Sequence, residues 1–279
     1  MAAQPAHADG NLSIIRRDLP SRDIFERNFA AVSLPAIFTG VVSAWPSFGS
    51  WSFDWFKETH GDTIVPIQFI NVEVPRSADE KRRAYGVERR FTLAEYIDSY
   101  VKAGDSGAYL SSFDLFRVIP ALANDVRFPR YHRYDILTSR SAWMGMGGSK
   151  VHCDFADNLF AQLVGTKIIS LYSPRSLISR YPDRWSWYSC FCEVDFDYFE
   201  PRPEDAEAIQ DLRPDYSFEI CAGEMLYIPY GWWHRVQTPE PTISVNQWWM
   251  TPRMLARRGP CIPVDYARRG LRRVSRVLR

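Results

Sequence analysis

The sequence predicts a mainly β protein with flanking helices, arranged as an antiparallel sandwich or barrel. Between residues 142 and 250, short strand-like runs follow one another without long helices between them, and glycine and proline interrupt the series. This pattern is typical of antiparallel β architectures. The chain has 279 residues, of which 46% are hydrophobic, and this is enough apolar material for a packed core.

The first part of the chain combines short helices with strands. Strands are expected at Leu34–Phe38 and at Ile64–Phe69, which follows a turn-forming Gly-Asp pair. Thr92 is expected to cap the start of a helix, because Glu95 stands three residues later in the capping-box position. Another short helical piece is expected at Ile119–Asn124.

The strand-rich part contains an expected hairpin. Asn158–Val164 and Lys167–Tyr172 are strand-like and are joined by Gly165-Thr166. A two-residue link with glycine first suits a type II′ turn, so we expect the two strands to pair with each other. Further strands are expected at Phe218–Cys221, Met225–Ile228 and Thr242–Met250.

One folded domain is expected over residues 13–251. Residues 1–12, which are mostly small and polar, are expected to be disordered. A segment at about 181–215, rich in proline, aspartate and aromatic residues, is expected to be a long insertion with one short helix around 203–210. Residues 252–279 are expected to form a basic helical C-terminal extension.

Positive charge gathers at the C-terminal end. Nine arginines and one aspartate give residues 250–279 a net charge of +8, so the rest of the chain carries −7. Within Val264–Arg279, apolar residues recur at spacings of three and four with arginines opposite them, which is the pattern of an amphipathic basic helix. We favour packing on the core or homodimerisation through this helix over binding to nucleic acid or anionic lipid, two partners that basic helices also have.

The sequence favours a cytoplasmic protein. It contains no run of 18 or more apolar residues that could cross a membrane, and its N-terminus lacks the basic and apolar regions of a secretory signal. Its five cysteines are an odd number at irregular spacing, which argues against a disulfide framework. These features are typical of a protein from a reducing compartment.

The residues most informative about chemistry lie in the run GSKVHCD. If this segment is extended, His152 and Asp154 point to the same face and can approach one ion together. An imidazole and a carboxylate are suitable ligands for ferrous iron, and His234, which follows a Pro/Gly turn, would complete a facial triad of two histidines and one carboxylate. A lone His-x-Asp pair is also common on protein surfaces, so the motif needs support.

Lys167 offers that support. It lies in an apolar strand, where an unpaired ammonium would be costly, so it could pair with a ligand carboxylate such as the distal one of 2-oxoglutarate. The alternative is a lysine at a hairpin end that extends to solvent. Asn158, Phe160 and Gln162 alternate with apolar residues and therefore share one face, which would give a small acid polar partners and a wall.

A zinc site built on cysteines is a competing interpretation. Cys190 and Cys192 stand one residue apart, whereas structural zinc sites favour pairs separated by two to four residues. Ordinary small core or loop residues explain the cysteines better.

Several segments together resemble the JmjC/cupin-like 2-oxoglutarate oxygenases, and most closely the hydroxylase branch that includes the asparaginyl hydroxylase acting on the hypoxia-inducible factor. The segments that carry the resemblance, which spans roughly residues 13 to 250, are Pro35–Gly40 with Ala44–Pro46 and Trp51-Ser52, Met144–Asp154, Asn158–Lys167, Gly223–His234 and Ser244–Trp249. In combination these motifs are far more specific than a His-x-Asp pair.

The resemblance implies a double-stranded β-helix, or jelly roll, and a set of site residues. His152, Asp154 and His234 would bind Fe(II), and Lys167 would pair with the distal carboxylate of 2-oxoglutarate. Three further residues match family positions near the co-substrate or the metal-bound shell, although an ordinary buried amide explains each asparagine almost as well. They are Ser149, Asn158 and Asn246.

The implied activity is a dioxygenase reaction. O2 would be consumed while 2-oxoglutarate is decarboxylated to succinate and CO2, and an unactivated C–H bond in a protein side chain, a peptide, an amino acid or another small molecule would be hydroxylated. Family relatives also include N-methyl demethylases and a tRNA-nucleoside hydroxylase, so these stay open as alternatives. A cupin that binds without catalysis would need the same barrel but no lysine for the co-acid.

Overall fold

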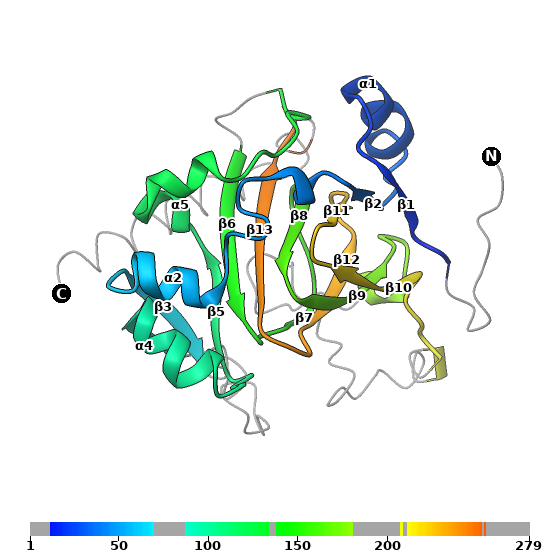
Figure 1. Cartoon of the computed structure of the whole chain (residues 1–279). Coiled ribbons are helices and arrows are strands. Elements are labelled where there is room, and N and C mark those ends of the chain that lie inside the picture. Colours follow the sequence, from blue (N-terminus) through cyan, green and yellow to red (C-terminus); the bar gives the residue numbers. More distant parts are fainter. Residues whose placement is uncertain are drawn as a thin grey trace.

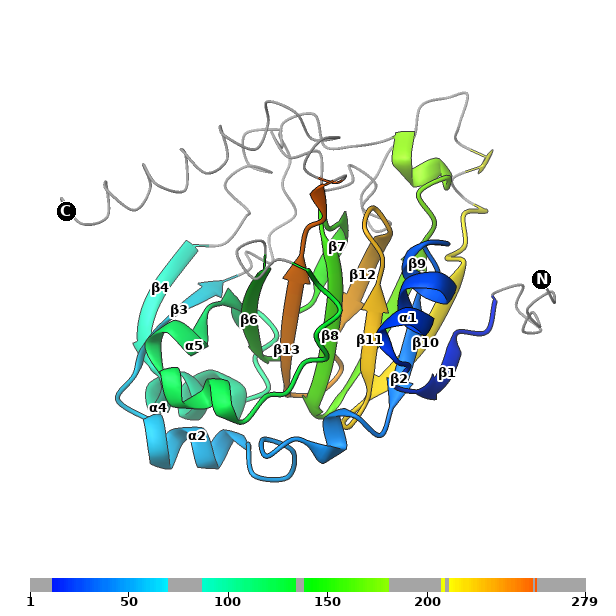
Figure 2. The same cartoon turned by 90° about the horizontal axis from the view of Figure 1, so that it is seen from above.

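A computed structural model of the chain shows two facing β-sheets, with helices along the outer face of the larger one (Figures 1 and 2). The structure describes residues 12–69, 87–133, 138–180, 207–208, 211–252 and 254. The larger sheet has nine strands, in the order β1 (Ile15–Asp18), β2 (Ala36–Thr39), β11 (Met225–Ile228), β8 (Asp157–Val164), β13 (Thr242–Trp249), β6 (Thr138–Gly145), β5 (Ala108–Phe113), β3 (Ile64–Phe69) and β4 (Val87–Thr92). The smaller sheet has four strands, in the order β10 (Tyr216–Cys221), β9 (Thr166–Tyr172), β12 (Trp233–Gln237) and β7 (Ser149–Cys153).

The eight strands from β6 to β13 form a double-stranded β-helix. Strands β6, β13, β8 and β11 are neighbours in the larger sheet, and β7, β12, β9 and β10 make up the smaller one. The chain changes sheets at each connection from β6 to β9 and again from β10 to β13, so the two sheets close around one interior. The expected fold class, a mainly β jelly roll with flanking helices, is confirmed.

The expected hairpin at Gly165 is wrong. β8 pairs with β11 and β13, whereas β9 pairs with β10 and β12 in the other sheet. Gly165 has a φ of +72°, and a Cβ there would lie 2.8 Å from the carbonyl oxygen of Pro241. Glycine is therefore required at a sharp turn, as the sequence indicated, but the turn carries the chain from one sheet to the other because both edges of β8 are already occupied.

Other expected strands lie close to their sequence ranges. The strand expected at 34–38 is β2, which begins two residues later, and the strand expected at 64–69 is β3 with the same bounds. The remaining three expectations correspond to β10, β11 and β13 with shifts of at most two residues.

The helices are short, and several are 3₁₀ or π helices instead of α helices. They are α1 (Arg22–Phe25), the π-helical η1 (Glu26–Ala30), η2 (Val42–Ala44), α2 (Phe53–His60), α4 (Leu93–Tyr96), the π-helical η3 (Ile97–Val101), α5 (Leu115–Val118), η4 (Pro120–Asn124) and η6 (Leu177–Arg180). The capping box before α4 is confirmed, since the Thr92 hydroxyl accepts from Glu95 N at 3.2 Å and the Glu95 carboxylate accepts from Thr92 N at 2.8 Å. The helix expected at 119–124 is η4, a 3₁₀ helix. In the described part of the chain, no helix has the length and apolar character needed to span a membrane.

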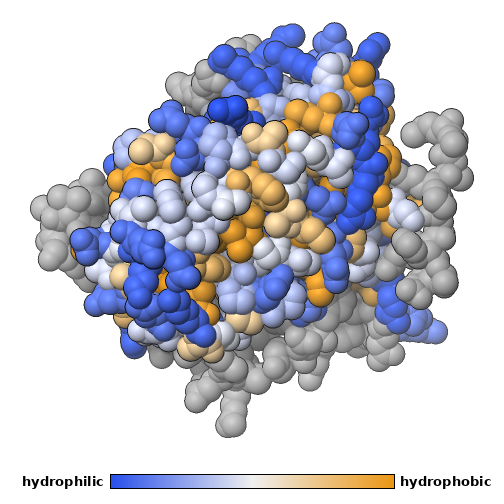
Figure 3. Space-filling model, in the orientation of Figure 1, coloured by the Kyte–Doolittle hydropathy of each residue, from blue (hydrophilic) through white to orange (hydrophobic). Residues whose placement is uncertain are grey.

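Apolar side chains from the helices pack on the outer face of the larger sheet. Phe25 is fully buried there; its ring stacks on Tyr131 with centroids 3.9 Å apart and meets Tyr227 edge-on at 4.7 Å. On the surface in Figure 3, by contrast, apolar residues form small groups separated by polar ones, as is usual for a folded domain.

Replacing Phe25 by alanine is expected to lower the free energy of unfolding by about 3–5 kcal/mol, because it removes a large ring from a close-packed aromatic cluster and leaves a cavity. Denaturant unfolding followed by circular dichroism measures this change. The matched control is Val32→Ala, at a side chain that is 51% exposed, where a change within about 0.5 kcal/mol is expected. An equal effect of the two substitutions would contradict the assigned packing.

Three sequence-based expectations lie wholly or mainly outside the described residues. They are the disordered N-terminus at 1–12, the insertion at 181–215 and the basic C-terminal extension at 252–279. Of the helix expected around 203–210, only residues 207–208 are described, and they are helical. Homodimerisation through the C-terminal helix therefore stays a prediction.

Candidate metal centre

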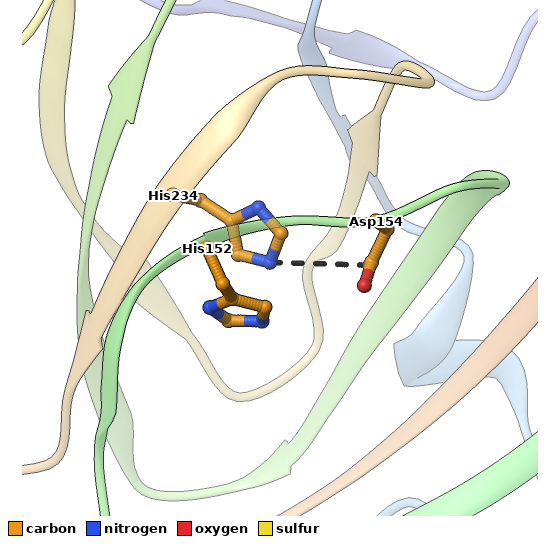
Figure 4. A group of neighbouring side chains, drawn as sticks. All are labelled: His152, Asp154 and His234. Atoms are coloured by element: carbon orange, nitrogen blue, oxygen red, sulfur yellow. Dashed lines mark ion pairs between the residues drawn. The ribbon is translucent and has the colours of Figure 1, made fainter. Parts of the chain in front are cut away.

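His152, Asp154 and His234 meet at one end of the double-stranded β-helix. The antiparallel pairing of β7 with β12 places His234 directly opposite His152, and Asp154 follows the last residue of β7. The two imidazole centroids are 4.1 Å apart, and His234 Nε2 lies 3.9 Å from Asp154 Oδ2 (Figure 4). One potential ligand atom from each residue lies within 4.8 Å of the other two. This arrangement allows the three residues to bind a single ion.

Backbone carbonyl groups orient both imidazoles. His152 Nδ1 lies 2.8 Å from the carbonyl oxygen of Lys150, and His234 Nδ1 lies 3.1 Å from that of Trp232. A carbonyl oxygen can only accept, so each Nδ1 carries the proton and each Nε2 keeps its lone pair for a metal. Burial, with a smaller contribution from His152, also lowers the pKa of His234, which favours the neutral form that binds metal.

Two donors hold the carboxylate of Asp154. Its Oδ2 accepts from Asn158 Nδ2 at 2.9 Å and from Trp248 Nε1 at 2.8 Å. Asn158 is itself held, because its Oδ1 accepts from Asn246 Nδ2 at 2.9 Å. The two asparagines expected near the metal-bound shell therefore form a chain of hydrogen bonds that ends on a metal ligand. Such outer partners fix a ligand's orientation.

Lys167 is fully buried in the same interior. Its Nζ donates to Ser244 Oγ at 2.7 Å and to Tyr109 Oη at 3.1 Å, and lies 5.1 Å from the centre of the Phe160 ring. The alternative of a solvent-directed lysine is therefore wrong. Among the described residues no carboxylate forms an ion pair with it, and burial lowers its pKa to about 7. A buried ammonium with only hydroxyl partners is suited to receive a carboxylate from a ligand.

Among the described residues, some other polar atoms of this interior form no hydrogen bond at all. Trp143 and Gln162 both lie opposite Ser244 on the strands beside β13, so all three side chains point to the same side of the larger sheet. Within the described part of the chain, three buried atoms at such interior positions form no hydrogen bond: Trp143 Nε1, Gln162 Oε1 and Asn246 Oδ1. Since buried polar groups are normally satisfied, this interior fits a polar ligand.

Ser149 is the expected site residue with the least direct support. It lies on β7 and is half-buried, and its hydroxyl accepts from Val236 N at 3.1 Å. This hydrogen bond joins β7 to β12, so a role of Ser149 toward a co-substrate stays a prediction.

Three residues with direct contacts to the site were absent from the sequence-based set. Trp248 and Ser244 share the face of β13 that carries Asn246, so the period of two along this strand could have identified them. Tyr109 comes from β5, outside the eight strands of the β-helix, and nothing in its sequence neighbourhood indicates the contact with Lys167.

A double-stranded β-helix with two histidines and one carboxylate at one end defines the class of non-haem iron proteins with a facial triad. A family model described as a cupin-like domain matches residues 21–254 of the chain. The chain is 30% identical over 243 residues to lysine-specific demethylase 8 of Danio rerio, with 82% of this chain and 56% of that protein covered. It is 27% identical to Jumonji C domain-containing protein 5 of Drosophila melanogaster, covering 86% and 60%, and 25% identical to tRNA wybutosine-synthesizing protein 5 of Gallus gallus, covering 88% and 78%.

The chain belongs to the JmjC/cupin-like family of Fe(II)- and 2-oxoglutarate-dependent oxygenases. It spans little more than half the length of the demethylase and Jumonji relatives named above. The donor set fits the family's metal, since Fe(II) is bound by imidazole and carboxylate ligands.

Proposed function

We propose that this chain is a 2-oxoglutarate-dependent hydroxylase, which holds Fe(II) through His152, Asp154 and His234 and holds 2-oxoglutarate against Lys167. The single observation that carries the proposal is the presence, in one β-helix interior, of a facial triad and a buried lysine with no carboxylate partner among the described residues. A binding protein without catalysis would have no need for both, and this disfavours the non-catalytic cupin.

The residues around Lys167 would hold the distal carboxylate of 2-oxoglutarate. Nζ would supply the charge, and the hydroxyls of Tyr109 and Ser244, which already lie within hydrogen-bond distance of Nζ, can turn to donate to the carboxylate. Phe160 would form a wall beside the aliphatic part of the co-substrate, and Ser149 would add a hydroxyl from the smaller sheet.

The three interior atoms without a hydrogen bond would contact the remaining polar groups of the co-substrate, the substrate or bound water. Trp143 Nε1 can donate to an oxygen atom, and Gln162 Oε1 and Asn246 Oδ1 can accept from a hydroxyl or a water. Iron, O2 and the co-substrate supply the oxidising chemistry, while the protein binds, orients and excludes water.

Hydroxylation of a C–H bond also accounts for the demethylase alternative, because hydroxylation of an N-methyl group gives an unstable product that loses formaldehyde. Of the relatives described above, one is named as a lysine-specific demethylase and another as a tRNA wybutosine-synthesizing protein. A methylated lysine and a modified nucleoside are therefore candidate prime substrates beside protein side chains and amino acids. A cytoplasmic location stays a prediction.

Succinate formation without a prime substrate tests the proposal. Anaerobically purified protein is given Fe(II), 2-oxoglutarate and O2, and succinate is quantified. We expect succinate that depends on iron. Titrations of Co(II) and of 2-oxoglutarate accompany the assay, since tight coupling to a substrate can suppress idle turnover. If no succinate forms and neither Co(II) nor 2-oxoglutarate binds, the proposal is overturned in favour of a non-catalytic cupin.

A further inference from the structure

A buried carboxylate close in sequence to the metal ligands has no part in the functions assigned above. Asp157 begins β8, is only 5% exposed, and forms no ion pair with any described residue. Its Oδ1 accepts two hydrogen bonds, from Tyr227 Oη at 2.9 Å and from Tyr230 N at 3.0 Å. Burial raises the pKa of Asp157 to about 6. The charged carboxylate is therefore costly to bury at this position.

The second of these bonds holds the turn between β11 and β12. Tyr230 lies in this turn, and the next residue, Gly231, donates its N–H to the backbone carbonyl oxygen of Asp154 at 3.2 Å. Gly231 has a φ of +80°, a conformation that favours glycine. The turn is therefore tied at adjacent residues to the segment 154–157, once to the backbone of a metal ligand and once to the side chain of Asp157.

His234 is the second residue of β12, which follows this turn. Trp232 N donates to the carbonyl oxygen of Pro229 at 3.2 Å, and the carbonyl oxygen of Trp232 orients the imidazole of His234. The turn, Trp232 and His234 thus form one connected unit. Displacement of the turn would move the His234 imidazole relative to Asp154, from which its Nε2 is now 3.9 Å distant.

We infer that Asp157 is a positioning residue of the iron site, which holds the β11–β12 turn so that His234 faces Asp154. Pairing of β8 with β11 does not need this side chain, because four residue pairs from Met225↔Ala161 to Ile228↔Asn158 already join the strands. The bond to Tyr230 lies beyond that ladder, at the point where the chain leaves β11 for the strand that carries His234. The inference rests on the proposed iron site.

Cobalt(II) binding to the full chain tests this role, since the absorption spectrum of Co(II) reports both affinity and ligand geometry. Asp157→Ala removes the acceptor, and we expect the affinity to fall by about 10–100-fold, as for other outer partners of metal ligands, together with a changed spectrum. Asp157→Asn keeps an oxygen acceptor of the same shape and is expected to stay within about threefold of the wild type. Asp157→Glu keeps the charge but displaces the acceptor by one methylene, so we expect a loss of affinity there too; it provides a second test if the alanine variant does not fold.

Asp125→Ala is the matched control, because it also deletes a carboxylate that accepts a hydrogen bond, from Trp51 Nε1 at 3.1 Å, but lies away from the turn. It is expected to leave the cobalt spectrum and affinity unchanged. Wild-type affinity and spectrum in the alanine variant, or in the glutamate variant if the alanine variant does not fold, would overturn the positioning role and leave the iron site intact. Absence of cobalt binding to the wild type would overturn the iron site and this inference together.

Discussion

Alanine in place of His152 is expected to abolish iron-dependent succinate formation while the protein stays folded. The substitution removes one of three metal ligands, and loss of even an outer partner of a ligand costs about 10–100-fold, so a loss of more than about a hundredfold is expected. The measurement is succinate at saturating 2-oxoglutarate, accompanied by a Co(II) titration and a thermal unfolding curve.

The melting temperature of the metal-free His152→Ala protein is expected to change little, for a physical reason. The imidazole of His152 lies against that of His234 with centroids 4.1 Å apart, and this proximity disfavours the charged form of His234. Because this shift keeps His234 neutral near pH 7, removing the neighbouring ring does not change its charge. The substitution also breaks the contact with the carbonyl oxygen of Lys150, but Lys150 is exposed and water can replace the lost partner.

Cys153→Ala provides the control for this variant. Cys153 is the next residue along β7 and points to the opposite side, where it packs in a buried cluster with Trp233 and Tyr172. It is expected to retain succinate formation. Normal turnover in His152→Ala, or equal loss in both variants, would contradict the assignment of His152 as a ligand.

The proximity of His152 and Asp154 could be predicted from the sequence because the two residues obey a local rule. His152 and Asp154 share a face in any extended segment, whatever the rest of the fold does. His234 could be named as a candidate from its place after a Pro/Gly turn, and the resemblance to the family supported this choice, since no local rule tells which of the other histidines lies beside them. The register that sets His234 opposite His152 is a property of the pairing of β7 with β12.

Strand pairing was harder to predict than strand position. The Gly165-Thr166 link signals a sharp turn, and a sharp turn is present, but its sequence does not say whether the next strand lies in the same sheet or in the facing one. β8 is buried on both faces and hydrogen-bonded on both edges. The pairing of β8 with β11 and β13 therefore overrides the local preference of the turn. This pairing depends on the whole β-helix and not on the sequence of the turn.

The hydrogen-bond partners of Lys167 were also hard to predict from the sequence. Burial of the lysine could be anticipated from its apolar neighbours, but the hydroxyl of Tyr109 is 58 positions away in sequence and that of Ser244 is 77 positions away. Contacts at such separation follow from the packing of β5 and β13 against the interior. The period of two along β13 places Ser244 on the same face as Asn246, but no window of the sequence reveals that it contacts Lys167.

Binding of 2-oxoglutarate is expected to be coupled to proton uptake by Lys167. Burial lowers the pKa of this amine to about 7 in the free protein, so at pH 8.5 it is mostly neutral, whereas a bound carboxylate favours the ammonium form. Each pH unit above about 7 then weakens binding up to about tenfold, because one proton must be taken up with the co-substrate. Calorimetric titration of 2-oxoglutarate into the Co(II)-loaded protein, in buffers of different ionisation enthalpy, is expected to show nearly one proton taken up at pH 8.5 and much less at pH 6.

The lowered pKa of Lys167 also predicts how the stability of the free protein depends on pH. Higher pH weakens 2-oxoglutarate binding but is expected to stabilise the fold. Between pH 7 and 10.5 the unfolded chain holds a proton on this lysine that the folded protein lacks, so the Lys167 contribution to the free energy of unfolding rises with pH in this window. Lys167→Met is expected to remove both that rise and the proton uptake, and to weaken 2-oxoglutarate binding by at least about thirtyfold, as does truncation of one partner of a buried charge pair. Lys150→Met, at an exposed lysine on β7, is expected to change none of these three properties. Constant affinity from pH 6 to 8.5 without proton uptake would show that Lys167 does not change its protonation state on binding, and unchanged affinity in Lys167→Met would place the co-substrate carboxylate elsewhere.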